Sequence, residues 1–314
     1  MYSSLDKLLN IKYPIIMAPM FLVTNTKMMI TALNSGIGAC IPSLNYKTNN
    51  ELKNALEEIR SKTNSSALGV NLITNNSNFQ LQKHLKTCVE LKVDFIITSL
   101  GNPKQVINTC KEKKIKVFCD VINLEMAKKA QSLGADGVIA VNNHAGGHLG
   151  KISAEEIMNQ FKHIIKIPII SAGGVGTKEG VKAKMKLGFS GLSIGSPFIA
   201  CEEAEISNDY KQACVKYGKK DIVISTKISG IPCTVINTPY VKEIGTQQNF
   251  IEKILNKNKA LKKWFKMLLF YKGFKVIKKA AFSATYKTVW CAGESIEHTK
   301  EILPLRKIIK RLTI

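Results

Sequence analysis

Residues 137–150 read Gly-Val-Ile-Ala-Val-Asn-Asn-His-Ala-Gly-Gly-His-Leu-Gly, and the pattern that they begin recurs along the chain. The first five residues are apolar, which is typical of a buried β-strand. Two histidines and three glycines follow within eight residues. Glycine lets backbone approach a ligand closely, and histidine transfers protons near neutral pH. The stretch therefore predicts a buried strand that ends in a functional loop, with an ordinary strand-ending turn as the alternative.

Short apolar runs alternate with longer amphipathic runs over most of the first 200 residues. The helical patterns cover 25–35, 49–60, 78–91, 103–113, 123–133, 153–165 and 177–187, and an eighth begins near Phe198. Such alternation indicates a parallel sheet covered by helices, and eight units in roughly 200 residues favour a closed (β/α)8 TIM barrel. The eight expected strands are Tyr13–Met17, Gly38–Ile41, Leu68–Asn71, Asp94–Ser99, Ile115–Cys119, Asp136–Val141, Pro168–Ser171 and Gly191–Ile194.

Local signals support these boundaries, and the pattern changes after about residue 215. Ser153 and Glu156 have the spacing of a capping box, and Gly134 and Gly188 have the positions of helix C-terminal glycines. We expect a barrel domain over residues 1–225. A C-terminal, mainly helical appendage is expected over 226–314, with an irregular crossing segment at 226–240 and a basic helical extension at 246–282. That extension either docks on the barrel or, as the alternative, lies on a membrane surface.

Composition narrows the classes of function. The formal net charge is +23, but only three of the 46 basic residues are Arg, the residue that carries most bidentate phosphate and base recognition, so we expect no nucleic-acid partner. Residues 241–314 hold 17 Lys and Arg against 5 Asp and Glu. The eight cysteines form no Cys-x-x-Cys pair, and the N-terminus lacks a signal-peptide pattern, so we expect reduced thiols and a cytoplasmic location.

The ends of the predicted strands collect the residues with chemical functions. Gly173-Gly174 follows the seventh strand and Gly195-Ser196 follows the eighth, where TIM barrels commonly bind phosphate. The alternative is a pair of ordinary tight turns. His144 and His148 are four apart, but two glycines separate them and no third ligand is evident, so we expect no metal site. Packing or surface roles are expected for three other histidines, His84, His163 and His298.

The chain resembles the nitronate monooxygenases, formerly called 2-nitropropane dioxygenases, and their relatives the FMN-dependent enoyl-acyl-carrier-protein reductases. The resemblance covers most of residues 10–240, with a weaker match at Trp290-Cys-Ala-Gly293. It rests on Pro14-Ile-Ile-Met-Ala-Pro-Met20, Gly69-Val-Asn71, Ala145-Gly-Gly-His148-x-Gly150, Pro168-Ile-Ile-Ser-Ala-Gly-Gly174, Leu187-Gly188 and Gly195-Ser196-x-Phe198.

This resemblance implies an FMN-binding TIM barrel in which His148 is the catalytic residue. Gly173, Gly174, Gly195 and Ser196 would hold the FMN phosphate. The rest of the cofactor would lie against Ala18, Met20, Asn71, Gly146 and Gly147. The implied reaction is oxidation of alkyl nitronates by O2. The alternative is an NAD(P)H-dependent reductase of enoyl thioesters or quinones. The sequence leaves the oligomeric state open, a homo-oligomer included.

Three positions depart from the family pattern. His144 stands where an acidic residue is usual, and Ser196-Pro197 stands where Thr-Arg is usual. Asp120, at the end of the fifth strand, stands where we expect a small neutral residue. A carboxylate beside a flavin or a phosphate is unfavourable unless it is paired. The lysine-rich composition would supply such a partner.

Overall fold

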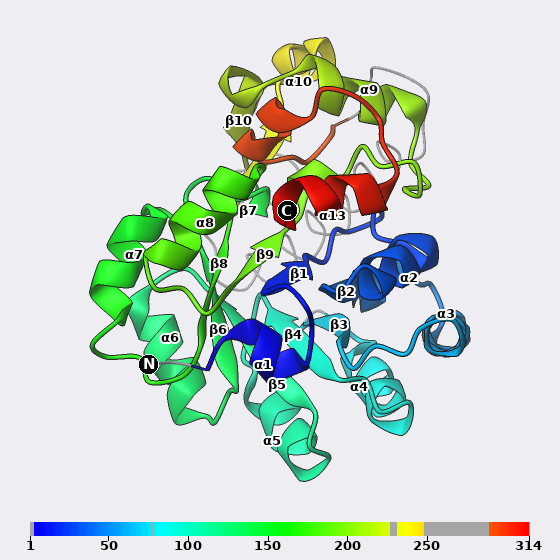
Figure 1. Ribbon diagram of the computed structural model, residues 1–314, viewed down its shortest axis with the longest axis vertical. Helices are drawn as coiled ribbons and strands as arrows, with labels where there is room; N and C mark the ends of the chain where they lie inside the picture. Colours follow the sequence, from blue (N-terminus) through cyan, green and yellow to red (C-terminus); the bar gives the residue numbers. More distant parts are fainter. Residues whose placement is uncertain (1–2, 77, 227–230, 248–288, 314) are drawn as a thin grey trace, which may run out of the picture.

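Eight parallel strands close into a barrel in the order β1-β2-β3-β4-β5-β6-β8-β9 (Figure 1). The computed structural model describes residues 3–76, 78–226, 231–247 and 289–313. The predicted (β/α)8 architecture is confirmed. The barrel strands are β1 Ile15–Met17, β2 Gly38–Pro42, β3 Leu68–Ile73, β4 Phe95–Ser99, β5 Lys116–Val121, β6 Gly137–Val141, β8 Ile169–Ala172 and β9 Gly191–Ile194.

The barrel interior is filled with side chains rather than open. β1 pairs with β9 through Ile16 and Ser193, which closes the ring. A Cβ atom at Gly69 would overlap the ring of Phe95, which contacts Phe118 edge to face with 5.6 Å between ring centroids. Glycine is therefore required on β3 because aromatic rings from β4 and β5 fill the space beside it.

Helices cover the outside of the barrel, and the predicted capping box and helix C-terminal glycines are confirmed, although the helix expected at 153–165 ends at residue 161. The capping box of Ser153 and Glu156 opens the helix at 154–161, and Gly134 and Gly188 have positive φ angles just after their helices. A short N-terminal helix, α1 Leu5–Leu9, was not predicted; its two end leucines are buried. The outer helices are α2 Thr26–Asn34, α3 Asn49–Ser61, α4 Leu81–Glu90, α5 Lys104–Glu112, α6 Leu124–Ser132, α7 Ala154–Phe161 and α8 Lys178–Lys186.

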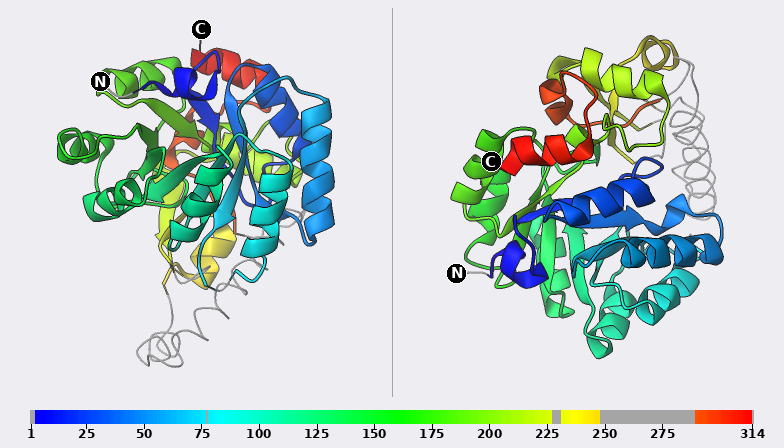
Figure 2. Two further views of the ribbon diagram at one scale, coloured as in Figure 1. Left: turned by 90° about the horizontal axis from the view of Figure 1, so that it is seen from below. Right: turned by 45° about the vertical axis from the view of Figure 1, so that its right-hand side comes forward.

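The eighth helix does not begin near Phe198 as the sequence predicted. Only a 3-10 turn forms there, η2 Ser196–Phe198, and Cys201 then pairs with Leu303 of the C-terminal region. The next helix is α9 Asn208–Lys216. The C-terminal helix α13 Leu305–Thr313 instead packs against α2 and α8 (Figures 1 and 2). The end of the chain thus covers the outside of the barrel between its first and last helices.

A small second sheet lies beyond the barrel, in the order β10-β11-β7. Its strands are β10 Ile222–Ser225, β11 Cys233–Ile236 and β7 Gly147–His148. The expectation of an irregular segment was therefore wrong for 233–236, where Thr234, Val235 and Ile236 favour a strand despite the flanking prolines. The remaining elements are α10 Pro239–Ile244 and the 3-10 turns η1 Ser43–Asn45, η3 Lys219–Asp221 and η4 Glu294–His298.

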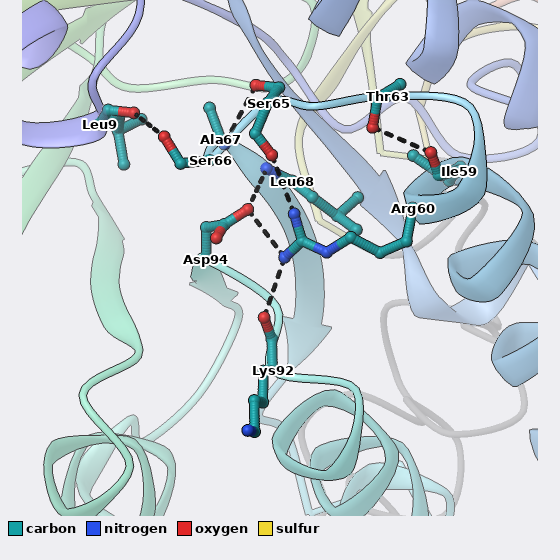
Figure 3. A network of polar contacts seen from close by, with 10 residues as sticks. All are labelled: Leu9, Ile59, Arg60, Thr63, Ser65, Ser66, Ala67, Leu68, Lys92 and Asp94. Atoms are coloured by element: carbon teal, nitrogen blue, oxygen red, sulfur yellow. Dashed lines mark hydrogen bonds and ion pairs between the residues drawn. The ribbon is translucent and has the colours of Figure 1, made fainter.

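An arginine side chain links elements at the N-terminal ends of the barrel strands (Figure 3). Arg60, in α3, lies 2.9 Å from the Asp94 carboxylate and also donates to the carbonyls of Ser65 and Lys92. The same carboxylate accepts the backbone N–H of Leu68 at 2.8 Å. One guanidinium thus joins α3 to the starts of β3 and β4.

The proposed division at residue 225 stays a prediction. Most of the basic stretch at 246–282 lies outside the described residues. Within the described part of the chain, no helix is long and apolar enough to cross a membrane. All eight cysteines lie in the described part of the chain, where none of them forms a disulfide and seven are buried.

Candidate active site

A cavity of about 400 Å³ opens at the carboxyl ends of the barrel strands. This is within the size range of small-molecule sites. All of the residues proposed from the sequence line it, although they come from five different parts of the chain. They are Ala18, Met20, Asn71, Gly146, Gly147, His148, Gly173, Gly174, Gly195 and Ser196.

Bare backbone forms the side of the cavity next to β8 and β9. Gly173 has a φ of +111° and Gly174 a φ of +75°, which is the left-handed region that favours glycine. A Cβ atom at Gly146 would lie 2.7 Å from the Ser196 hydroxyl oxygen and 2.9 Å from the backbone nitrogen of Gly293. These positions keep backbone N–H groups and one hydroxyl close to the cavity, a combination suited to binding an anion.

The C-terminal segment forms part of this wall. The backbone N–H of Gly293 donates to the Ser196 hydroxyl at 2.8 Å. Ala292 and Ser295 line the cavity, and so do Tyr210 and Cys291. Sequence reasoning missed these residues, although the weak match at Trp290–Gly293 was the signal that could have found them.

The small second sheet holds His148 at the edge of the cavity. β7 pairs with β11 so that His148 lies opposite Cys233. The Nε2 atom is shielded from solvent and has no hydrogen-bond partner within the described part of the chain. Burial lowers the pKa of His148, so its ring is neutral near pH 7. A neutral, unpartnered imidazole beside a cavity can accept a proton from a bound molecule.

His144 has a different environment from His148. Its Nδ1 atom lies 2.7 Å from the carboxylate of Glu294, and Lys219 lies 3.1 Å from the same oxygen. His144 does not line the cavity. It therefore joins the loop after β6 to the C-terminal segment. No cluster of three or more metal-binding side chains occurs among the residues that the structure describes.

A polar chain crosses the ends of β3, β4 and β5 on another side of the cavity. The Asn71 amide donates to the Ser99 hydroxyl at 2.7 Å, and that hydroxyl donates to the Asp120 carboxylate at 2.5 Å. Burial raises the pKa of Asp120 to about 6, and the Ser99 hydrogen bond opposes this rise. Among the described residues the partner of Asp120 is thus a hydroxyl, and a lysine partner stays a prediction.

Comparison with protein families identifies the chain. The nitronate monooxygenase family model matches residues 2–314. The chain belongs to this family. Nitronate monooxygenases are FMN-dependent oxidoreductases, so the chain is an enzyme of that general kind.

Two curated relatives of this nitronate monooxygenase family member are distant in sequence. A probable nitronate monooxygenase of Staphylococcus aureus is 24% identical over 293 residues, which cover 79% of this chain and 82% of the relative. A (3aS,4S,5R,7aS)-5-hydroxy-7a-methyl-1-oxo-octahydro-1H-indene-4-carboxyl-CoA dehydrogenase of Rhodococcus jostii is 24% identical, over 77% of this chain and 67% of its own length.

Solved structures agree with the fold. FabK from Thermotoga maritima has a TM-score of 0.84 and 25% identity, over 99% of this chain and 95% of its own. A nitroalkane oxidase from Streptomyces ansochromogenes has a TM-score of 0.78 and 18% identity, over 99% and 96% of the two chains. At 18% identity the second likeness concerns the fold alone.

Proposed function

We propose that this protein oxidises alkyl nitronates with O2 by means of FMN, with His148 as the catalytic base. The observation that carries the proposal is that His148 and the glycine backbone after β8 and β9 border one cavity, and that the Nε2 atom of His148 has no hydrogen-bond partner among the described residues. Family membership supports the flavin, and the geometry of the cavity supports these positions for the residues.

The cavity fits FMN in size and in the arrangement of its polar groups. Gly173, Gly174, Gly195 and Ser196 offer N–H groups and a hydroxyl for the phosphate. The wall formed by Ala18, Met20, Gly146 and Gly147 is apolar or bare backbone and suits a flat ring, and Asn71 supplies a polar contact. FMN supplies the electron transfer when it is bound, and the protein supplies position and electrostatics.

His148 moves or holds a proton in this scheme. Its neutral ring accepts the α-carbon proton of a neutral nitroalkane, which yields the nitronate, or it donates a hydrogen bond to the nitro oxygens of a bound nitronate. The β7–β11 pairing fixes the backbone of His148 beside Cys233, which holds the imidazole at the cavity edge. The apolar wall excludes water from the reacting atoms.

Oxygen uptake with ethylnitronate tests this function. The purified flavoprotein is expected to consume O2 when ethylnitronate is added and to retain its flavin. A protein that binds FMN and consumes no O2 with ethylnitronate or propionate 3-nitronate would refute the nitronate assignment and leave the fold unaffected.

His148→Asn tests the role of the base. We expect turnover to fall about 100-fold or more while FMN occupancy stays at the wild-type level, because a general base contributes factors of this size. Because burial lowers the pKa of His148, the base form persists below the usual histidine range, and loss of the base should lower wild-type turnover only at a pH below that range. Full turnover by His148→Asn would mean that another group accepts the proton.

The second candidate is an NAD(P)H-dependent reductase of enoyl thioesters or quinones. The likeness to FabK over 99% of this chain favours it. Rapid anaerobic loss of the oxidised flavin spectrum on addition of NADH would support this reaction, and an unchanged spectrum would exclude NADH as the electron donor.

A further inference from the structure

The charge of the cavity is opposite to the charge of the chain. The chain has a formal net charge of +23. Among the described residues that line the cavity there is no Lys or Arg, and Asp120 is the one acidic residue. The other titratable lining groups are His148, Tyr210 and the thiols of Cys233 and Cys291. A ligand in this cavity therefore meets a carboxyl group with no basic side chain of the described residues beside it.

Asp120 lies across the cavity from the glycine backbone. It ends β5, next to Ser99 at the end of β4, whereas Gly195 and Ser196 follow β9. In the ring of eight strands, β4 lies directly opposite β9, and β5 lies next to β4. A molecule whose anionic group lies on the glycine backbone would thus have its other end near Asp120.

We propose that Asp120 is a specificity-determining residue that makes the reaction site favour uncharged ligands over anionic ones. This proposal rests on the proposed function, because it concerns the ligand that lies beside the flavin. A nitronate is an anion, so Asp120 would weaken its binding whenever the carboxyl group is ionised.

Among the described residues, the groups around Asp120 supply no positive charge to compensate it. Ser99 donates one hydrogen bond, at 2.5 Å. The nearby thiols of Cys40 on β2 and Cys119 on β5 have pKa values raised chiefly by burial and further by Asp120, so both thiols are neutral. The ring of His148, on β7, is neutral near pH 7. Above pH 6 most Asp120 carboxyl groups are ionised, and the repulsion of an anion is then greatest.

Nitronate turnover is therefore expected to fall at both higher and lower pH, for two different reasons. As pH rises through about 6, Asp120 ionises and the affinity for an anionic ligand falls. As pH falls toward the lowered pKa of His148, the base is lost. Nitronate turnover should therefore have a narrow optimum, and turnover of an uncharged substrate should lack the loss at higher pH.

Propionate and propionamide form a matched pair of probes, since they have similar shapes and differ in charge. Their binding to the holoprotein is measured from the change in the flavin spectrum, with no turnover required. At about pH 8 we expect Asp120→Asn to bind propionate about tenfold or more tightly than wild type, and to bind propionamide within about twofold of wild type, as a single nearby charge predicts. Glu125→Gln removes an exposed carboxylate from α6 and should change neither affinity.

The wild-type protein gives a second test that needs no variant. As pH is lowered from about 8 to about 5.5, the affinity of the wild-type protein for the propionate anion should rise toward that of Asp120→Asn, because the Asp120 carboxyl group becomes protonated. Equal changes for the two probes, no change in either, or no propionate binding by any variant would overturn the proposal.

The two proposals can fail separately. Tighter propionate binding by Asp120→Asn, without O2 uptake on ethylnitronate, would support the role of Asp120 and refute the nitronate reaction. Nitronate turnover with unchanged propionate binding would refute the role of Asp120 alone.

Discussion

Gly146 and Gly293 approach each other so closely that neither position has room for a side chain. A Cβ at Gly293 would lie 2.7 Å from the backbone nitrogen of Gly146. A Cβ at Gly146 would meet Gly293 and the Ser196 hydroxyl in the same way. This contact holds the C-terminal segment against the loop after β6, so the shape of the cavity requires glycine at both positions.

Gly146→Ala should therefore weaken flavin binding. We expect the dissociation constant for FMN to rise about tenfold or more, because the methyl group must displace the Ser196 hydroxyl and the backbone nitrogen of Gly293. Flavin release measured by fluorescence checks this result. Gly180→Ala in α8 is the matched control, because its Cβ would have ordinary contacts of 3.5 Å or more, with Thr177 and Val175. Equal FMN affinity of the two variants would contradict the close approach.

The sequence predicted the residues of the cavity wall unevenly. Asn71, Gly173 and Ser196 could be placed because the carboxyl ends of parallel barrel strands meet at one face. Tyr210 and Cys291 could not, because their positions depend on the second sheet and on the return of the C-terminal segment. Asp120 was noticed as a departure, but its Ser99 partner became evident only from the neighbouring strand.

At the level of elements, the repeating strand-helix pattern predicted the barrel, and the strands β7 and β11 of the second sheet were not predicted. The eight barrel strands were predicted because each is an apolar run between helical patterns. β7 is only two residues, Gly147 and His148, and has no periodicity to detect. The eighth helix was placed too early because residues after Phe198 pair with Leu303 instead of continuing a helix.

The Arg60 network gives a prediction for elements α3, β3 and β4. Arg60→Ala should lower the free energy of unfolding by about 1–3 kcal/mol, because Asp94 loses its ion pair and two carbonyls lose a charged donor. Urea unfolding measures this change. Activity of the folded protein should persist, since the network joins the starts of β3 and β4 whereas the cavity lies at the carboxyl ends of the strands.

Arg306→Ala is the control for this variant. Arg306 is exposed on α13, so its loss should change stability by less than about 0.5 kcal/mol. If Arg60→Ala were as stable as Arg306→Ala, the Arg60 network would contribute nothing to the fold.

At the scale of the whole molecule, distant parts of the chain complete the barrel and its cavity. α13 packs on α2 and α8, and residues 291–295 form part of the cavity wall. The net charge of +23 gave no indication of the cavity's own charge, because no Lys or Arg of the described residues lines it. Total charge is a property of the surface and does not predict the chemistry of a buried site.

The absorption spectrum of the purified protein under nitrogen, before and after ethylnitronate, tests the central claim most directly. We predict one FMN per chain and loss of the oxidised flavin spectrum on addition of ethylnitronate, with recovery when O2 is admitted. A colourless protein that does not take up FMN, or a bound flavin whose spectrum ethylnitronate leaves unchanged, would contradict the account.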